Sequence, residues 1–154
     1  MKPDVVIWAA GGRPIAPGSI EGIHGDNVCT AIDALLNNAL LGENIAVIGG
    51  GLVGLETAVD LTQRGKKVTV VEMAPKLCER IQNMMMIMGL VKKYQIPSQV
   101  NTRLLKIEPD GIVVQKENGE EKIPCDTVVL AMGFRPDDSV YEEIAGDYKT
   151  VKVG

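Results

Sequence analysis

Residues 44–72 constrain the fold more tightly than any other stretch of this chain. The run from Ile45 to Ile48 is continuously apolar, as in a strand that is buried on both faces. The next residues, Gly49 to Gly54, read G-G-G-L-V-G and so have the spacing G-x-G-x-x-G, and a helical pattern of apolar residues follows them. A second apolar run ends in Glu72. The stretch therefore predicts a strand, a glycine turn, a helix and a second strand.

This arrangement predicts a dinucleotide site. Gly49 allows the tight turn, Gly51 lets the backbone approach a pyrophosphate, and Gly54 lets the helix pack closely on the strand. The free N–H groups and the positive dipole end of the helix then face the diphosphate. Glu72 follows at the distance where an acid accepts hydrogen bonds from the adenosine ribose. The predicted cofactor-binding residues are Gly49, Gly50, Gly51, Leu52, Val53, Gly54 and Glu72.

Composition excludes several other classes of protein. The chain has 154 residues, of which 45% are hydrophobic and 23% charged, as in an ordinary globular domain. Its formal net charge of -4 offers no basic surface for a nucleic-acid partner. No apolar run is long enough to span a bilayer, so we expect no membrane partner.

The cysteines and the histidine form no recognisable metal or catalytic pattern. Cys29, Cys78 and Cys125 lie far apart and lack zinc spacing, which favours buried thiols in a reducing cytoplasm. The single histidine, His24, has no second ligand or base near it in the sequence, so we interpret it as a surface or packing residue. We predict no metal site.

The rest of the chain predicts further elements on either side of the glycine turn. A buried strand is expected at 4–10, and a short helix at 30–41 with Thr30 as its N-cap. A second helix is expected at 78–94, where four closely spaced methionines cannot all face inward. A short third strand is expected at 99–100.

After the third strand the pattern changes from parallel strands to an antiparallel one. Residues 103–107, 112–115 and 120–123 alternate like strands, and turn signals separate them. A last buried strand is expected at 126–131. We therefore predict an α/β fold, a Rossmann-like three-layer arrangement whose parallel sheet has a three-stranded antiparallel meander as one crossover.

The end of this pattern repeats its beginning. Residues 4–14 and 126–136 share Asp, Val, Ala, Gly, Arg and Pro in register. Two strands can end in similar turns by coincidence. Alternatively, the two segments end two related nucleotide-binding units.

These motifs together resemble a known family. Residues 4–14, the fingerprint from Gly49 to Ala58, the meander and the segment 131–136 are similar to the NAD-binding domain of the pyridine nucleotide-disulfide oxidoreductases, flavoproteins with two dinucleotide-binding domains. The resemblance covers nearly the whole chain. Within the family, residues 45–73 look most like the C-terminal part of the old-yellow-enzyme-like 2,4-dienoyl-CoA reductases and NADH:flavin oxidoreductases.

The resemblance implies how the chain is divided. Residues 1–12 would be a residual strand of a truncated FAD domain, 13–41 a linker with a short helix, 42–136 the NAD-binding domain, and 137–154 a return toward the missing FAD domain. The chain would then be a fragment of a larger enzyme and inactive in isolation. Its lone strand at 4–9 would be disordered or would pair with a second copy, as in a homodimer.

The resemblance also implies residue roles. Glu56 is similar to the family glutamate near the nicotinamide and the flavin and is the candidate catalytic residue, unless it is a solvent-facing helix carboxylate. Gly133 is similar to the glycine that lets the last loop approach the cofactor. Glu72 favours NAD over NADP because a carboxylate repels a 2′-phosphate, although Lys76 and Arg80 would soften this preference.

The resemblance therefore implies a function. The chain would be the NADH-binding domain of an FAD-dependent oxidoreductase, in which NADH delivers hydride to flavin and the partners are NADH and the FAD domain of the parent chain. The alternatives are a free-standing NAD-dependent dehydrogenase and a non-catalytic dinucleotide-binding module. The dehydrogenase is disfavoured because no His, Tyr-Lys pair or metal set is available for substrate chemistry.

Overall fold

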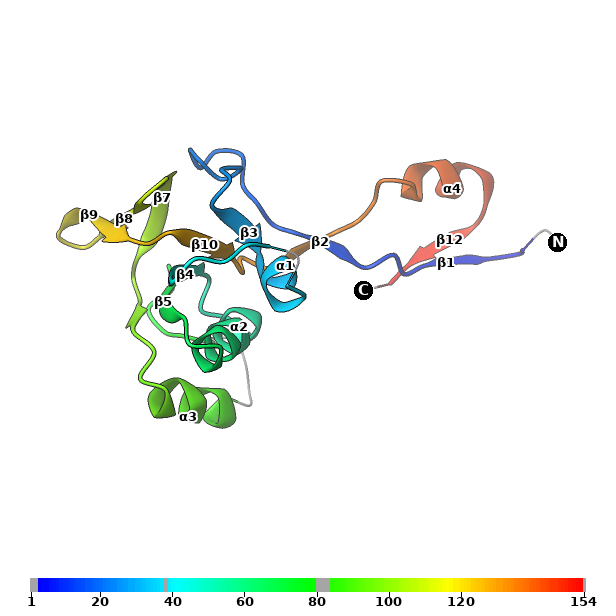
Figure 1. Cartoon of the computed structure of the whole chain (residues 1–154). Helices are drawn as coiled ribbons and strands as arrows, with labels where there is room; N and C mark the ends of the chain where they lie inside the picture. Colours follow the sequence, from blue (N-terminus) through cyan, green and yellow to red (C-terminus); the bar gives the residue numbers. More distant parts are fainter. Residues whose placement is uncertain (1–2, 38, 80–83, 154) are drawn as a thin grey trace. The chain divides into compact units, whose positions relative to one another are not determined.

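The structure, a computed structural model, describes residues 3–37, 39–79 and 84–153. Contacts divide the chain into two compact units. The sheet unit is Ile15–Gly133, and the terminal unit combines Met1–Pro14 with Phe134–Gly154. Figure 1 follows the chain through both.

A five-stranded parallel sheet forms the centre of the sheet unit. Its strand order is β3-β10-β4-β5-β6, and every neighbouring pair is parallel. The strands are β3 (Val28–Thr30), β10 (Thr127–Leu130), β4 (Asn44–Ile48), β5 (Lys67–Val71) and β6 (Ser98–Gln99). β10 is buried along its whole length, and β4 is buried after its first residue, as their continuous apolar runs predict.

Helices cover one face of this sheet. They are α1 (Ala31–Leu35), α2 (Leu52–Gln63) and α3 (Met85–Lys93). Their buried side chains share a core with alternate residues of the central strands. The strand residues in this core are Ile45, Val47, Val68, Val70 and Val129.

A meander covers the other face. It consists of β7 (Arg103–Glu108), β8 (Gly111–Lys116) and β9 (Gly119–Pro124), which pair antiparallel in that order. Its core includes the intervening strand residues Ala46, Ile48, Val71, Val128 and Leu130. Because successive strand residues point to opposite faces, the two cores make a three-layer fold. Figure 1 shows the helices and the meander on opposite sides of the sheet, and the predicted fold class is confirmed.

The helices differ in extent from the sequence prediction. Thr30 caps α1 as expected, and its hydroxyl accepts a hydrogen bond from the Asp33 N–H at 3.2 Å. The helix ends at Leu35 rather than at 41, because Asn37 adopts the left-handed conformation (φ 57°), which asparagine tolerates better than most residues. Leu40, which lies within the predicted range of this helix, is fully exposed.

The methionine-rich helix also begins later than expected. α3 starts at Met85, whereas the predicted helix starts at 78, and part of that interval lies outside the described residues. Met85 and Met86 are 89% and 78% exposed, which confirms that the methionines cannot all face inward. Ile87 and Val91 provide the buried face of the helix instead.

Part of the predicted linker belongs to the sheet. Residues 28–30, within the 13–41 range, form β3 and pair with β10. A strand of three residues is too short for alternation to reveal it in the sequence.

The terminal unit contains two strand pairs and a helix. β1 (Val6–Trp8) pairs parallel with β12 (Thr150–Lys152), and β2 (Gly12–Pro14) pairs antiparallel with β11 (Phe134–Pro136). Helix α4 (Tyr141–Asp147) brings the Tyr141 ring edge-on to Trp8, with ring centroids 6.1 Å apart.

The first strand therefore differs from its prediction in two ways. It has a partner, β12, within the same chain, so it is not a lone strand. It is also not buried, because Ile7 is 68% exposed.

The two repeated segments have the same backbone feature at their turns. Gly11 and the equivalent Gly133 both have positive φ, 74° and 96°. Such angles are readily adopted only by glycine, so the recurrence of glycine has a conformational cause in both segments.

Candidate functional site

The glycine turn follows β4 and lies between the ends of the neighbouring strands β5 and β10. The Gly49 N–H donates to the Val71 carbonyl at the end of β5, at 2.8 Å. Gly49 has a φ of 112°, and a Cβ there would overlap the Ala131 carbonyl oxygen just beyond β10. Only glycine therefore fits this position, as the sequence predicts.

Gly54 and Gly51 have opposite surroundings. A Cβ on Gly54 would overlap the Gly49 carbonyl oxygen, so this glycine allows α2 to pack against the turn. A Cβ on Gly51 would meet no atom within 4 Å. Open space of this kind is what a pyrophosphate would need beside a glycine turn, and it lies at the N-cap of α2. No described side chain caps α2, so its first-turn N–H groups remain available to an anion.

Glu72 lies beside this turn, half-buried after the end of β5. Its Oε2 accepts a hydrogen bond from the Gly50 N–H at 2.6 Å, and its Oε1 accepts one from the Ala74 N–H at 2.7 Å. A cavity of about 310 Å³ opens at this point. Its lining residues are Gly50, Gly51, Glu72, Ala74, Lys76, Cys78 and Glu79. The structure therefore brings two predicted glycines and the predicted ribose ligand into one cavity.

The other predicted residues are not part of the lining of this cavity. Leu52 and Val53, in the first turn of α2, are 38% and 39% exposed. Glu56 is exposed one turn further along the helix. Gly133 lies beyond β10, and its carbonyl accepts a hydrogen bond from the Ile15 N–H at 3.0 Å. Arg80 lies outside the described residues.

Cys78 is a member of the site that sequence reasoning missed. Its side chain is buried, its backbone is left-handed (φ 51°), and its N–H donates to the Gly50 carbonyl at 2.8 Å. Burial, followed by the charges of Glu72 and Glu56, raises the pKa of the Cys78 thiol. The residue contributes through its main chain, and a main-chain contact leaves no signal in the residue type.

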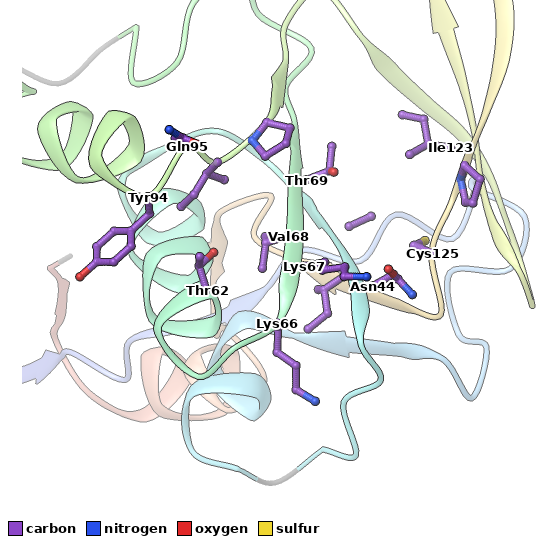
Figure 2. A pocket seen from close by; sticks show the side chains of 15 residues that line it. Asn44, Thr62, Lys66, Lys67, Val68, Thr69, Tyr94, Gln95, Ile123 and Cys125 are labelled. Atoms are coloured by element: carbon purple, nitrogen blue, oxygen red, sulfur yellow. The ribbon is translucent and has the colours of Figure 1, made fainter.

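A larger cavity, of about 370 Å³, lies at the opposite ends of the strands. It is lined by Asn44 to Ala46 and Lys67 to Thr69, which begin β4 and β5. Figure 2 shows Thr62 and Tyr94 on one side of β5 and Cys125 on the other. Ligands of open parallel sheets bind at the carboxyl ends of the strands, so the smaller cavity beside the glycine turn is the dinucleotide candidate.

No metal centre is evident in the described part of the chain. Among residues 3–37, 39–79 and 84–153, no three His, Cys, Asp or Glu side chains are grouped as metal ligands would be. His24 is exposed and lines a third cavity, of about 250 Å³, with Cys29 and Asp33. Across the same residues, every helix is too short or too polar to cross a membrane.

Comparisons with known proteins agree with this arrangement. A family model described as pyridine nucleotide-disulphide oxidoreductase matches residues 1–150. The chain belongs to the pyridine nucleotide-disulphide oxidoreductase family. Among curated members, a cinnamate reductase from Clostridium sporogenes is 34% identical over 97% of this chain. An NADH oxidase from Thermoanaerobacter brockii is 38% identical over 88% of it.

Solved structures of related proteins have the same fold. A 2-naphthoyl-CoA reductase, in complex with 2-naphthoyl-CoA, superposes with a TM-score of 0.89 at 30% identity and covers 99% of this chain. The chain spans only about a quarter of these oxidoreductases: 23% of the cinnamate reductase, 22% of the NADH oxidase and 24% of the 2-naphthoyl-CoA reductase.

Proposed function

We propose that this chain is the NADH-binding part of an FAD-dependent oxidoreductase. The observation that carries the proposal is the cavity in which the open space over Gly51 and the carboxylate of Glu72 lie together. A pyrophosphate fits against the first, and a ribose fits against the second. Family membership and a relative named NADH oxidase support the choice of cofactor.

Each predicted residue has a defined task in this proposal. The turn from Gly49 to Gly54 and the start of α2 hold the pyrophosphate, and Glu72 accepts hydrogen bonds from the adenosine ribose. Glu56 lies near the nicotinamide and the flavin, and Gly133 lets the loop after β10 approach the cofactor, as the family resemblance implies. The bound dinucleotide supplies the hydride, and the chain supplies its position and electrostatics.

We propose NAD rather than NADP as the preferred dinucleotide. Glu72 places a negative charge where a 2′-phosphate would sit. Lys76 is the one cation in the described lining of the cavity, and it is exposed. A single exposed cation offsets the carboxylate only in part, because exposed charges are screened.

The parent enzyme is proposed to be of the old-yellow-enzyme-like group that contains dienoyl-CoA reductases and NADH:flavin oxidoreductases. Relatives named cinnamate reductase and 2-naphthoyl-CoA reductase support this, since both names describe reduction of an unsaturated acid or thioester. Their length, about four times that of this chain, leaves room for the flavin and substrate sites.

Two further features of the proposal concern location and assembly. Cys29, Cys78 and Cys125 are unbonded thiols, which suits a reducing cytoplasm.

A homodimer through β1 would have to use the free edge of that strand, because β12 already occupies the other edge.

Calorimetric titration of the chain with NADH and with NADPH tests the proposal. We expect NADH to bind more tightly than NADPH, and Lys76→Ala to weaken NADPH binding more than NADH binding. Equal or tighter binding of NADPH by the unaltered chain would contradict the assignment of Glu72. Failure to bind either dinucleotide would contradict the proposal, and turnover of an alcohol with NAD would favour the free-standing dehydrogenase.

A further inference from the structure

Gly50 is held through both its N–H and its carbonyl by the loop that follows β5. Its N–H donates to Glu72 Oε2 at 2.6 Å, and its carbonyl accepts from the Cys78 N–H at 2.8 Å. The second carboxylate oxygen of Glu72 accepts from the Ala74 N–H at 2.7 Å. The Glu72 side chain therefore connects the glycine turn to the loop, and the Cys78 N–H further along the same loop makes a second connection to Gly50.

Side chains of the same loop pack closely against Gly50. A Cβ on Gly50 would lie 2.5 Å from Leu77 Cδ2 and 2.9 Å from the Cβ of Glu72. The loop is anchored on its far side as well, because Asn101 donates to the Ala74 carbonyl at 3.0 Å. The position of Gly50 thus depends on a loop that is itself fixed to the segment after β6.

We propose that Glu72 is a positioning residue for the glycine turn, in addition to being the ribose ligand of the proposed function, on which this inference rests. Hydrogen bonds from N–H groups to a carboxylate are about twice as strong as neutral ones. One such bond holds the Gly50 N–H, and the other, from the Ala74 N–H, holds the carboxylate itself in place before any dinucleotide arrives. A carboxylate has about four acceptor sites, so two remain for ribose hydroxyls.

A positioning role for Glu72 and a role as ribose ligand alone predict different effects of the same substitution on the binding of inorganic pyrophosphate. Inorganic pyrophosphate can use the glycine turn but has no ribose. If Glu72 acts only on ribose, Glu72→Gln leaves pyrophosphate binding unchanged or strengthens it, because a negative charge near the anion is removed. If Glu72 positions the turn, the same change weakens pyrophosphate binding. Glutamine would turn its NH₂ group toward one of the two N–H donors.

The experiment uses the full chain and follows backbone amides by NMR. We expect Glu72→Gln to bind inorganic pyrophosphate about tenfold more weakly, the effect of losing one charge-assisted hydrogen bond. Hydrogen exchange at the Gly50 or Ala74 amide should accelerate in the free variant. Glu79→Gln is the matched control: it removes the same charge from the lining of the same cavity, and the Gly50 and Ala74 amides should exchange as in the unaltered chain.

Glu72→Asp separates the effect of the charge from the effect of side-chain length. It also tests the positioning role if Glu72→Gln does not fold. Aspartate keeps the charge but is one methylene shorter, so it should lose one of the two N–H bonds and again weaken pyrophosphate binding. Unchanged amide exchange and unchanged or tighter pyrophosphate binding in these variants would overturn the inference. Failure of the unaltered chain to bind NADH would instead count against the proposed function, and the exchange rates of Gly50 and Ala74 would still report on the positioning.

Discussion

The glycines of one motif have three different physical surroundings. Gly49 needs its positive φ, Gly54 needs the absence of a side chain against the turn, and Gly51 has open space above it. A substitution therefore acts on folding at two of these positions and on ligand binding at the third. The motif alone predicts this division, because each glycine serves a different contact in a dinucleotide site.

Comparing Gly51→Val with Gly54→Ala tests that division. Gly51 has a φ of -74° and no neighbour within 4 Å of a Cβ, so valine should leave the unfolding temperature nearly unchanged and abolish NADH binding. Gly54→Ala should lower the free energy of unfolding by about 1–3 kcal/mol through overpacking. Thermal unfolding and NADH titration of both variants measure this; normal NADH binding by Gly51→Val would place the site elsewhere.

The cysteines yield a second prediction at this scale. Burial, with smaller contributions from Asp33 and Asp126, raises the pKa of Cys29 and Cys125 to about 11. Few of these thiols are ionised at pH 8, so iodoacetamide should label them much more slowly than it labels the guanidinium-unfolded chain. Mass spectrometry after timed quenching follows the reaction. Labelling of the native chain at the unfolded rate would contradict the burial of Cys125 and the partial burial of Cys29.

At the scale of elements, the helices and strands that the sequence predicted are those with a strong hydrophobic period or a clear turn signal. The central strands, α2 and the meander follow from apolar runs, helical spacing and Asn118-Gly119. The strands β2, β3 and β11 have three residues each, which is too few for a period to emerge. The hydrogen bonds that Glu72 accepts from Gly50 and Ala74 were also missed, because their donors are main-chain N–H groups that only the fold brings together.

The pairing of β2 with β11 should depend on pH. Arg13 donates to Asp137 at 2.8 Å, and this contact, with hydrogen bonds from Ser139, lowers the pKa of Asp137 to about 2 from an ordinary 3.8. A lowered pKa in the folded state means that the stabilisation is present above about pH 4 and is lost as the pH falls toward 2.

Carboxyl-carbon NMR of Asp137 provides the measurement. The midpoint should lie near pH 2 in the unaltered chain and move toward 3.8 in Arg13→Ala. Asp137→Asn should weaken the β2–β11 pairing at pH 6, and its difference from the unaltered chain should shrink as the pH approaches 2. An ordinary midpoint in the unaltered chain would show that the ion pair does not form in solution.

At the scale of the whole molecule, both hydrophobic cores lie within one unit. Every buried member of the two cores falls between Ile23 and Leu130, inside the sheet unit Ile15–Gly133. The terminal unit has no comparable core among its described residues, and Val5, Ile7, Val151 and Val153 are 44–68% exposed. The fold class was predictable because the sheet unit carries all the strong patterns. The β1–β12 pairing was not, because 150–152 gave no signal of its own.

Residues 15–133 should therefore fold without the terminal unit. We expect the excised segment to unfold cooperatively and to bind NADH within about threefold of the full chain, since the cavity lining lies wholly inside it. Circular dichroism on heating and NADH titration are the measurements, with the full chain as the reference. A gradual, non-cooperative transition would mean that the terminal unit contributes to the folding of the sheet.

The hydrogen bond from Ile15 to the Gly133 carbonyl has a consequence for ancestry. It joins the first and last residues of the sheet unit, so the chain enters and leaves that unit at one point. A segment of this kind can be inserted into a host gene, or removed from it, with a single pair of breakpoints and without cutting a strand of its own sheet. The sheet unit is thus suited to transfer as a whole between oxidoreductases whose other domains differ.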